Sequence, residues 1–152
     1  MIVTKRLFSI ALFIFICCNG TLTVNAGGTG YIDYDKVVAE YRFAQTSLRE
    51  IQTKAEEIEK YLESKEDEFS KLDSPVQKQK LEATVRAEMR TKEAAFNDFR
   101  NKKEEAVYTK IHAVSEKIRM EKGLDAILDA ISVFSGGIDI TNELIMKLNS
   151  SN

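Results

Sequence analysis

Side chains that could act as nucleophiles, general bases or metal ligands are scarce in this sequence. Its 152 residues include two cysteines, Cys17 and Cys18, and one histidine, His112. A thiol could attack a substrate or bind zinc, and an imidazole could serve as a general base. Both cysteines fall in an amino-terminal segment expected to be removed, and a single histidine cannot form a multi-histidine metal site. The sequence therefore predicts a protein that is not an enzyme and has no metal or cofactor, with His112 on the solvent side of a helix.

The first 26 residues have the three parts of a secretory signal. Lys5 and Arg6 form a basic start, residues 7–18 form an apolar run, and Val24 and Ala26 supply small side chains for cleavage after residue 26. At ~1.5 Å per residue, the apolar run is too short to cross the ~30 Å hydrocarbon core of a bilayer as a membrane anchor. We expect this segment to be removed and a soluble exported protein to remain.

The remaining 126 residues carry 20 basic and 24 acidic side chains, for a net charge of −4. They contain no cysteine, no tryptophan and one proline. This composition excludes a disulfide scaffold, and a net acidic exported chain without interleaved basic and aromatic residues does not favour nucleic-acid binding. The length fits a single folded domain.

Apolar side chains recur at alternating intervals of four and three residues in the first half of this domain, a pattern typical of a coiled-coil seam. The seam positions are Val37, Tyr41, Ala44, Leu48, Ile51, Ala55, Ile58, Leu62, Lys65, Phe69 and Leu72. Lys65 is the one charged residue among them. The pattern predicts one long helix that packs against another helix.

A turn and a second helix follow the seam. Ser74 can cap a helix that begins at Pro75, and Gly123 supplies a left-handed stop at its end. Because the connection is short, the helices over residues 36–72 and 75–122 are predicted to run antiparallel as a hairpin. At ~1.5 Å per residue the second helix would be about 70 Å long, so the hairpin must project from the rest of the chain.

Short elements from both ends of the chain are expected to meet at the base of the hairpin. Residues 31–32 are predicted to form a strand that leads into the first long helix, with Asp33 or Asp35 as its cap. A narrow seam and short base elements bury little apolar surface within one chain. The sequence therefore predicts an oligomer.

The carboxyl-terminal elements are predicted from turn residues and short apolar runs. Residues 124–131 are expected to form a strand pair with the run at 132–135, because this stretch follows a helix stop. Gly136-Gly137 marks a turn, residues 138–140 are a brief extended segment, and Thr141 is expected to cap a closing helix.

Charges are distributed unevenly over the predicted hairpin. Residues 45–73 carry five basic and nine acidic side chains, whereas residues 74–110 carry nine basic and six acidic ones. In one interpretation these charges pair across the hairpin and keep it soluble and in register. In the other, a basic face attracts acidic segments or lipid headgroups. This basic face would contain Lys78, Lys80, Arg86, Arg90, Lys92, Arg100, Lys102 and Lys103.

Three stretches together carry a family resemblance. Residues 31–33 (YID), residues 121–129 (EKGLDAILD) and residues 138–144 (IDITNEL), arranged around a long hairpin, resemble the Skp/OmpH family of periplasmic chaperones. The resemblance spans essentially all of the chain after residue 26.

The resemblance implies an α+β, mostly α fold in which a long antiparallel coiled-coil hairpin projects from a small β-rich oligomerisation body. Three such chains would form a jellyfish-like homotrimer whose helical arms enclose a cavity. The signal peptide would occupy residues 1–26 and one chaperone domain residues 27–152. Within that domain the base would comprise residues 30–44 and 111–149, and the arm residues 45–110 with its tip near residues 73–75.

The function implied by the resemblance is that of an ATP-independent holdase in the periplasm of a Gram-negative-type bacterium. It would bind unfolded outer-membrane β-barrel proteins in the cavity and keep them soluble for delivery to the outer membrane and its assembly machinery. The trimer body would include Ile32, Val37, Leu124, Ile127, Leu128, Ile131, Val133 and Ile140. Turn or capping roles would fall to Asp33, Gly123, Asp139 and Thr141.

Side chains that contact the unfolded client are predicted among the apolar residues of the arm. The candidates are Phe43, Tyr61, Phe69, Val76, Phe96 and Phe99. Phe69 and Phe96 also fit the intramolecular seam, whereas Phe43 and Tyr61 are expected to lie off it.

This sequence differs from the family's best-known members in the charge of its arms. Residues 45–110 have a net charge of −1, whereas strongly basic arms are typical. Capture by long-range electrostatic attraction is therefore not favoured, and contact with lipopolysaccharide or the membrane surface is left open. The alternative function is a coiled-coil spacer or scaffold of the cell envelope that binds no clients.

Overall fold

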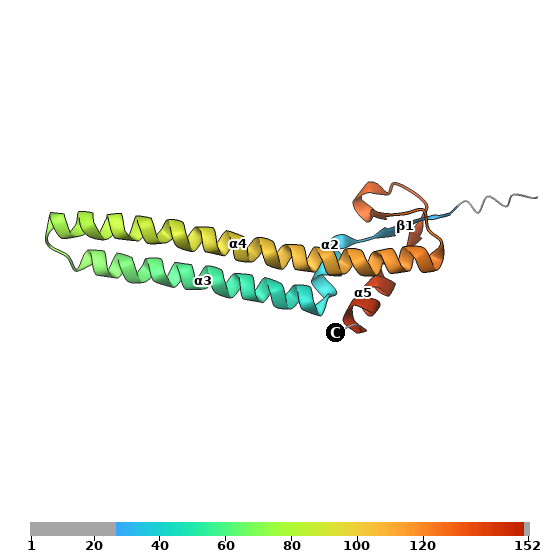
Figure 1. The fold of residues 1–152 in the computed structure, drawn as a ribbon, viewed down its shortest axis with the longest axis horizontal. Helices are drawn as coiled ribbons and strands as arrows, with labels where there is room; N and C mark the ends of the chain where they lie inside the picture. Colours follow the sequence, from blue (N-terminus) through green and yellow to red (C-terminus); the bar gives the residue numbers. More distant parts are fainter. Residues whose placement is uncertain (1–26, 151–152) are drawn as a thin grey trace, which may run out of the picture.

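The computed structural model describes residues 27–150 as a long two-helix arm joined to a small base (Figure 1). The predicted secretory signal lies outside the described residues. The elements are β1 (Thr29–Ile32), α2 (Tyr34–Glu40), α3 (Arg42–Ser70), α4 (Pro75–Lys122), β2 (Ala126–Asp129), the 3-10 helix η1 (Ala130–Ser132), β3 (Ile138–Asp139) and α5 (Thr141–Ser150). The prediction of a mostly helical fold with a small β component is thus confirmed.

The base contains a three-stranded parallel sheet in the order β2-β1-β3. Parallel neighbours need a long crossover connection, and the entire arm is the connection between β1 and β2. Gly30 and Ile32 are buried on the face of β1 that meets Leu124. A Cβ at Gly30 would lie 2.8 Å from Leu124 Cδ1, so glycine permits this close approach.

The predicted first helix is interrupted at Tyr41, which has extended backbone angles (φ −81°, ψ 114°) and separates α2 from α3. The expectation of one continuous helix over residues 36–72 is therefore wrong. The side chain of Asn149 on α5 stabilises the break: the Arg42 N–H donates to Asn149 Oδ1 at 3.0 Å, and Asn149 Nδ2 donates to the Glu40 carbonyl at 3.0 Å. One amide thus satisfies backbone groups on both sides of the interruption.

The arm consists of α3 and α4, which lie side by side in opposite directions (Figure 1). Pro75 occupies the first turn of α4, and Gly123 ends that helix in the left-handed conformation (φ 61°), as predicted. Ser74 stands at the cap position, but its side chain makes no capping hydrogen bond, which corrects that part of the prediction. None of the helices in residues 27–150 is long and apolar enough to span a membrane.

The hydrophobic core lies where the arm joins the base. Within the described residues, its buried side chains are Ile32, Val37, Tyr41, Ala44, Val107, Ile111, Ile118, Leu124, Ile140, Leu144, Ile145 and Leu148. No buried hydrophobic side chain comes from residues 45–106 of this set. The arm is therefore held by a half-exposed seam, as expected where only two helices pack together.

The strand pair predicted for residues 124–135 is wrong in its second half. Residues 126–129 form β2, but β2 pairs with β1, and η1 follows it directly. The Asp129 side chain accepts a hydrogen bond from the Ile131 N–H and caps η1, which turns the chain out of the sheet. Residues 133–137 then form an irregular loop.

Side-chain hydrogen bonds close the base where the two ends of the chain meet. Asp33 caps α2 by accepting from the Lys36 N–H at 2.9 Å, as predicted. Thr141 does not cap α5; it is the first residue of the helix, and its hydroxyl oxygen accepts from the Asp33 N–H at 3.0 Å. Asp139 Oδ1 accepts from the Thr141 N–H at 2.9 Å. Hydrogen bonds from the Thr141 hydroxyl and backbone hold the pKa of Asp139 below its ordinary value.

Candidate functional site

The packing of α3 against α4 leaves a strip of apolar side chains uncovered. Leu48 is 48% exposed and Leu62 36% exposed, although both were predicted to lie in the seam. Ala55, midway between them, is also exposed. Residues seven apart lie on one stripe of a helix, so these three side chains follow one flank of the arm. That flank offers an apolar surface along the outer edge of the predicted seam.

Tyr61 occupies the seam instead, so the expectation that it lies off the seam is wrong. Its hydroxyl donates to Glu88 Oε2 on α4 at 2.5 Å, and Lys92 Nζ lies 4.5 Å from the ring centroid. The hydrogen bond to Glu88 raises the pKa of Tyr61 to about 12, because it stabilises the protonated phenol beside a carboxylate. Tyr61 therefore joins the two helices.

Phe43 packs within the protomer, against the core of the base. It is half-buried, 5.9 Å from the Tyr41 ring between centroids. Lys110 Nζ on α4 lies 4.9 Å from its centroid. Phe43 thus helps join the arm to the base.

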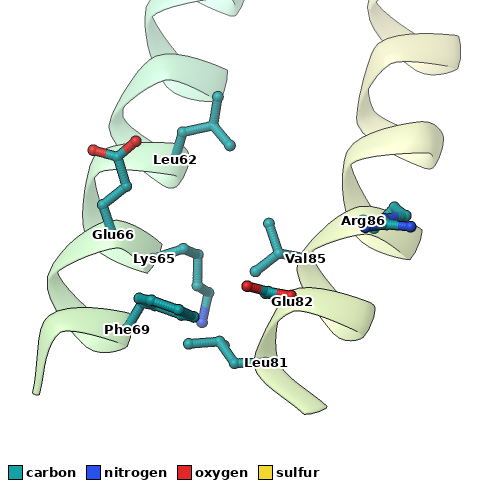
Figure 2. Close-up of a pocket in the computed structure, with 8 residues that line it drawn as sticks. All are labelled: Leu62, Lys65, Glu66, Phe69, Leu81, Glu82, Val85 and Arg86. Atoms are coloured by element: carbon teal, nitrogen blue, oxygen red, sulfur yellow. The ribbon is translucent and has the colours of Figure 1, made fainter. Parts of the chain in front are cut away.

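An apolar groove of about 440 Å³ lies between the helices near the tip of the arm. Figure 2 shows Leu62, Lys65 and Phe69 of α3 pointing across to α4. Leu81 and Val85 form the opposite wall, while the groove is also lined by Glu66, Glu82 and Arg86. It brings the predicted client-binding residue Phe69 together with three aliphatic residues outside that set, Leu62, Leu81 and Val85. Their apolar character and helical spacing were visible in the sequence, but their exposure was not.

The other client-binding candidates are spread along the arm. Val76 is 75% exposed at the tip, whereas Phe96 and Phe99 are half-buried. Arg100 and Lys103 lie 6.0 and 5.5 Å from the centroids of these two rings. Phe99 also lines a second groove with Thr53 and Glu57, among others, on the flank opposite Leu62. The six candidates therefore do not form a single surface.

Two cations of the basic face predicted on α4 pair with carboxylates of the same helix. Lys102 pairs with Asp98 at 2.7 Å, and Arg100 lies 3.9 Å from Glu104. In the part of the chain that the structure describes, one ion pair, Lys103–Glu50, joins α4 to α3. The expected charge pairing across the hairpin is therefore mostly wrong.

Contacts between cations and aromatic rings cross the arm more often than ion pairs do. Lys78 Nζ lies 5.0 Å from the Phe69 centroid, and Lys92 and Lys110 make similar contacts with Tyr61 and Phe43. Among residues 27–150, Lys80, Arg86 and Arg90 make no ion pair. These three do not form a dense cationic cluster, because acidic residues such as Glu82 and Glu88 are interspersed among them.

The residues predicted for the trimer body divide into two groups. The first group is buried in the core or packed against it: Ile32, Val37, Leu124, Ile127 and Ile140. The second group lies outside the core: Leu128 is 42% exposed, Ile131 is 91% exposed and Val133 is half-buried.

Two exposed apolar residues beside the Gly136-Gly137 turn were not predicted from the sequence. Phe134 is fully exposed, and Ile138 is 49% exposed. Both flank the Gly136-Gly137 turn, and an apolar side chain on either side of such a turn was the available signal. Phe134 and Leu128, which lie close together, are what we name the base patch. Ile138 pairs with Gly30 and therefore lies on the opposite face of the sheet from Leu128, which pairs with Tyr31. Beside the base patch lies a hollow of about 460 Å³, which is lined by Thr29, Tyr31, Leu128 and residues 132–137.

The position of His112 agrees with its predicted place on the solvent side of a helix. It is exposed on α4, with its ring 6.0 Å from that of Tyr108 between centroids. Among residues 27–150 no three histidine, cysteine, aspartate or glutamate side chains gather in a way that could hold a metal ion.

Comparison with known proteins gives a family match and related solved structures. A family model described as outer membrane protein (OmpH-like) matches residues 28–148. A crystal structure of an OmpH-like protein from Caulobacter crescentus CB15 is 12% identical, with 83% of this chain and 86% of that chain covered and a TM-score of 0.41. Comparison with curated protein sequences finds no match.

Proposed function

Because this chain belongs to the OmpH-like outer membrane protein family, we propose that it is an ATP-independent chaperone of the bacterial periplasm. Family membership confirms the resemblance drawn from the sequence. In this proposal the protein binds unfolded outer-membrane β-barrel proteins and keeps them soluble until delivery to the outer membrane and its assembly machinery. The predicted secretory signal supports export to that compartment.

The observation that carries the proposal is the open apolar groove between α3 and α4. Leu62, Phe69, Leu81 and Val85 line it without forming a closed core. Leu62 is 36% exposed and the other three are half-buried, so the groove keeps apolar surface within reach of an unfolded chain. Several weak apolar contacts along an arm can hold an unfolded chain and still exchange without an energy source.

A homotrimer formed through the base is part of the proposal. Ile131 and Phe134 stand outside the core, and β2 and β3 are the edges of the small sheet. Large exposed apolar side chains beside unpaired strand edges favour association with another copy. Three arms projecting from such a base would enclose a shared cavity.

Capture by apolar contact is favoured over capture by charge. Most of the cations that were predicted to form a basic face have acidic or aromatic neighbours on the arm itself. Interspersed charges of both signs produce little long-range field at physiological salt. The proposal therefore assigns no lipopolysaccharide site to this chain.

The test is a light-scattering measurement of residues 27–152, alone and after a urea-unfolded outer-membrane β-barrel protein is diluted into the sample. Aggregation of the β-barrel protein is followed in the same cuvette. We expect a trimer that holds the β-barrel protein in a soluble complex of defined mass. A trimer beside which the β-barrel protein aggregates as fast as in buffer would refute the chaperone function and favour an envelope scaffold. A monomer would refute the trimeric architecture.

A further inference from the structure

The groove near the tip has an origin in the sequence, at Lys65. This residue occupies a seam position between Leu62 and Phe69, where the spacing otherwise calls for an apolar side chain. Its ammonium group hydrogen-bonds Glu68 Oε2 at 2.7 Å, and its side chain is 29% exposed. A charged group is costly to bury, so Lys65 keeps this part of the seam open to water.

The walls of the groove can recognise side chains but not a backbone. Both walls are helices, α3 and α4, whose backbone groups bond within each helix. A bound segment therefore cannot add to them as a strand does to a sheet edge. Apolar contact with Leu62, Phe69, Leu81 and Val85 is the main attraction the groove offers (Figure 2).

The charges around the groove balance. Two cations, Lys65 and Arg86, and two anions, Glu66 and Glu82, line the groove. The Lys65 ammonium also has a carboxylate partner in Glu68. Paired opposite charges give a charged ligand little net attraction. The complementary occupant is therefore an uncharged, apolar segment. A volume of about 440 Å³ is near the lower end of the ~300–1,000 Å³ range of ligand pockets, which suits a few side chains and not a folded element.

We propose that this groove is a binding site for uncharged apolar side chains of an extended, unfolded outer-membrane β-barrel protein, and that one arm is sufficient to form it. The inference rests on the chaperone function proposed above and assigns its client contact to specific residues. Since both walls come from one protomer, each arm of an oligomer carries a complete site.

A substitution that fills the groove tests this assignment. Val85→Phe replaces an isopropyl group in the groove by a larger phenyl ring. Ala83→Phe is the matched control, because Ala83 is exposed and lies outside the groove. We expect Val85→Phe to raise the Kd for a urea-unfolded outer-membrane β-barrel protein about fivefold, the effect of losing part of one apolar side chain's burial. Ala83→Phe should change it less than about twofold.

A cross-linking experiment provides a second measurement that does not depend on how Val85→Phe packs. Residues 27–152 contain no cysteine, so Glu82→Cys and Ala83→Cys can each carry a single benzophenone label. Label at position 82 should cross-link the unfolded β-barrel protein more efficiently than label at position 83. If the parent binds the β-barrel protein but both labels react equally, or if Val85→Phe binds as tightly as Ala83→Phe, the groove assignment is wrong while the chaperone function stands. If the parent does not bind the β-barrel protein, both fail.

Discussion

Among the polar side chains, the Asn149 amide should contribute most to the stability of the junction between the arm and the base. It is the group on α5 that hydrogen-bonds both Arg42 and Glu40, on the two sides of the break between α2 and α3. Asn149→Ala removes both bonds and leaves a backbone N–H and a carbonyl without their side-chain partner. The substitution tests whether the carboxyl-terminal helix stabilises the point where the arm leaves the base.

The size of the effect follows from the two hydrogen bonds. Each contributes about 0.5–1.5 kcal/mol net, and both are exposed enough for water to replace part of the interaction. We therefore expect Asn149→Ala to lower the free energy of unfolding by about 1–2 kcal/mol. For a domain of this length that corresponds to a fall in Tm of about 4–8 °C.

Thermal unfolding followed by circular dichroism would measure the change, at one fixed protein concentration because association shifts the apparent Tm. Asn149→Asp keeps the acceptor for the Arg42 N–H but not the donor to Glu40, so its Tm should lie between those of the parent and Asn149→Ala. Asn142→Ala is the matched control on the same helix, since Asn142 accepts one bond from the exposed Lys36 ammonium. The reasoning is refuted if Asn149→Ala and Asn142→Ala lower Tm equally.

Two further predictions concern the base. Phe134→Ser should shift the light-scattering mass from trimer towards monomer, because Phe134 is fully exposed in the base patch. Met146→Ser is the control: Met146 is 65% exposed, and its substitution should leave the mass unchanged. Equal effects of the two substitutions would contradict the proposed interface. Acidification should weaken the packing of α5 on α4 through Glu143, whose pKa is held below its ordinary value of 4.5 by the hydrogen bond from Lys122 at 2.9 Å. A lowered pKa adds stability that is present above about pH 4.5 and is lost as the pH falls through the folded-state value. The parent should therefore have a higher Tm than Glu143→Gln above about pH 4.5, and the difference in Tm should vanish at lower pH. A difference in Tm that persists at low pH would contradict the role given to Glu143.

Local signals predicted several of the helix ends. Pro75 at the start of α4, Gly123 at its end and Asp33 at the cap of α2 all act within a few residues of their own position. Their roles follow from backbone angles and short-range hydrogen bonds, so they could be inferred without a tertiary structure.

The exposure of the arm's side chains could not be inferred in the same way. The seven-residue pattern placed Leu62 inside and Tyr61 outside, but Tyr61 reaches Glu88 on α4, and Leu62 stays 36% exposed at the groove between the helices. A small rotation of a helix about its axis exchanges neighbouring positions at the edge of a seam. The rotation is decided by the partner helix, which the spacing on one helix does not describe.

The sequence by itself thus determined the two helices of the arm, the turn between them and the family. The tertiary structure decided the break at Tyr41, the parallel pairing of β1 with β2 and the exposure of Phe134. Each of these depends on residues far apart in the chain: the partner of Glu40 is Asn149, and the partner of Thr29 is Ala126. Local pattern fixes what a segment can form, whereas its neighbours in space decide where that segment ends and which of its faces is left exposed.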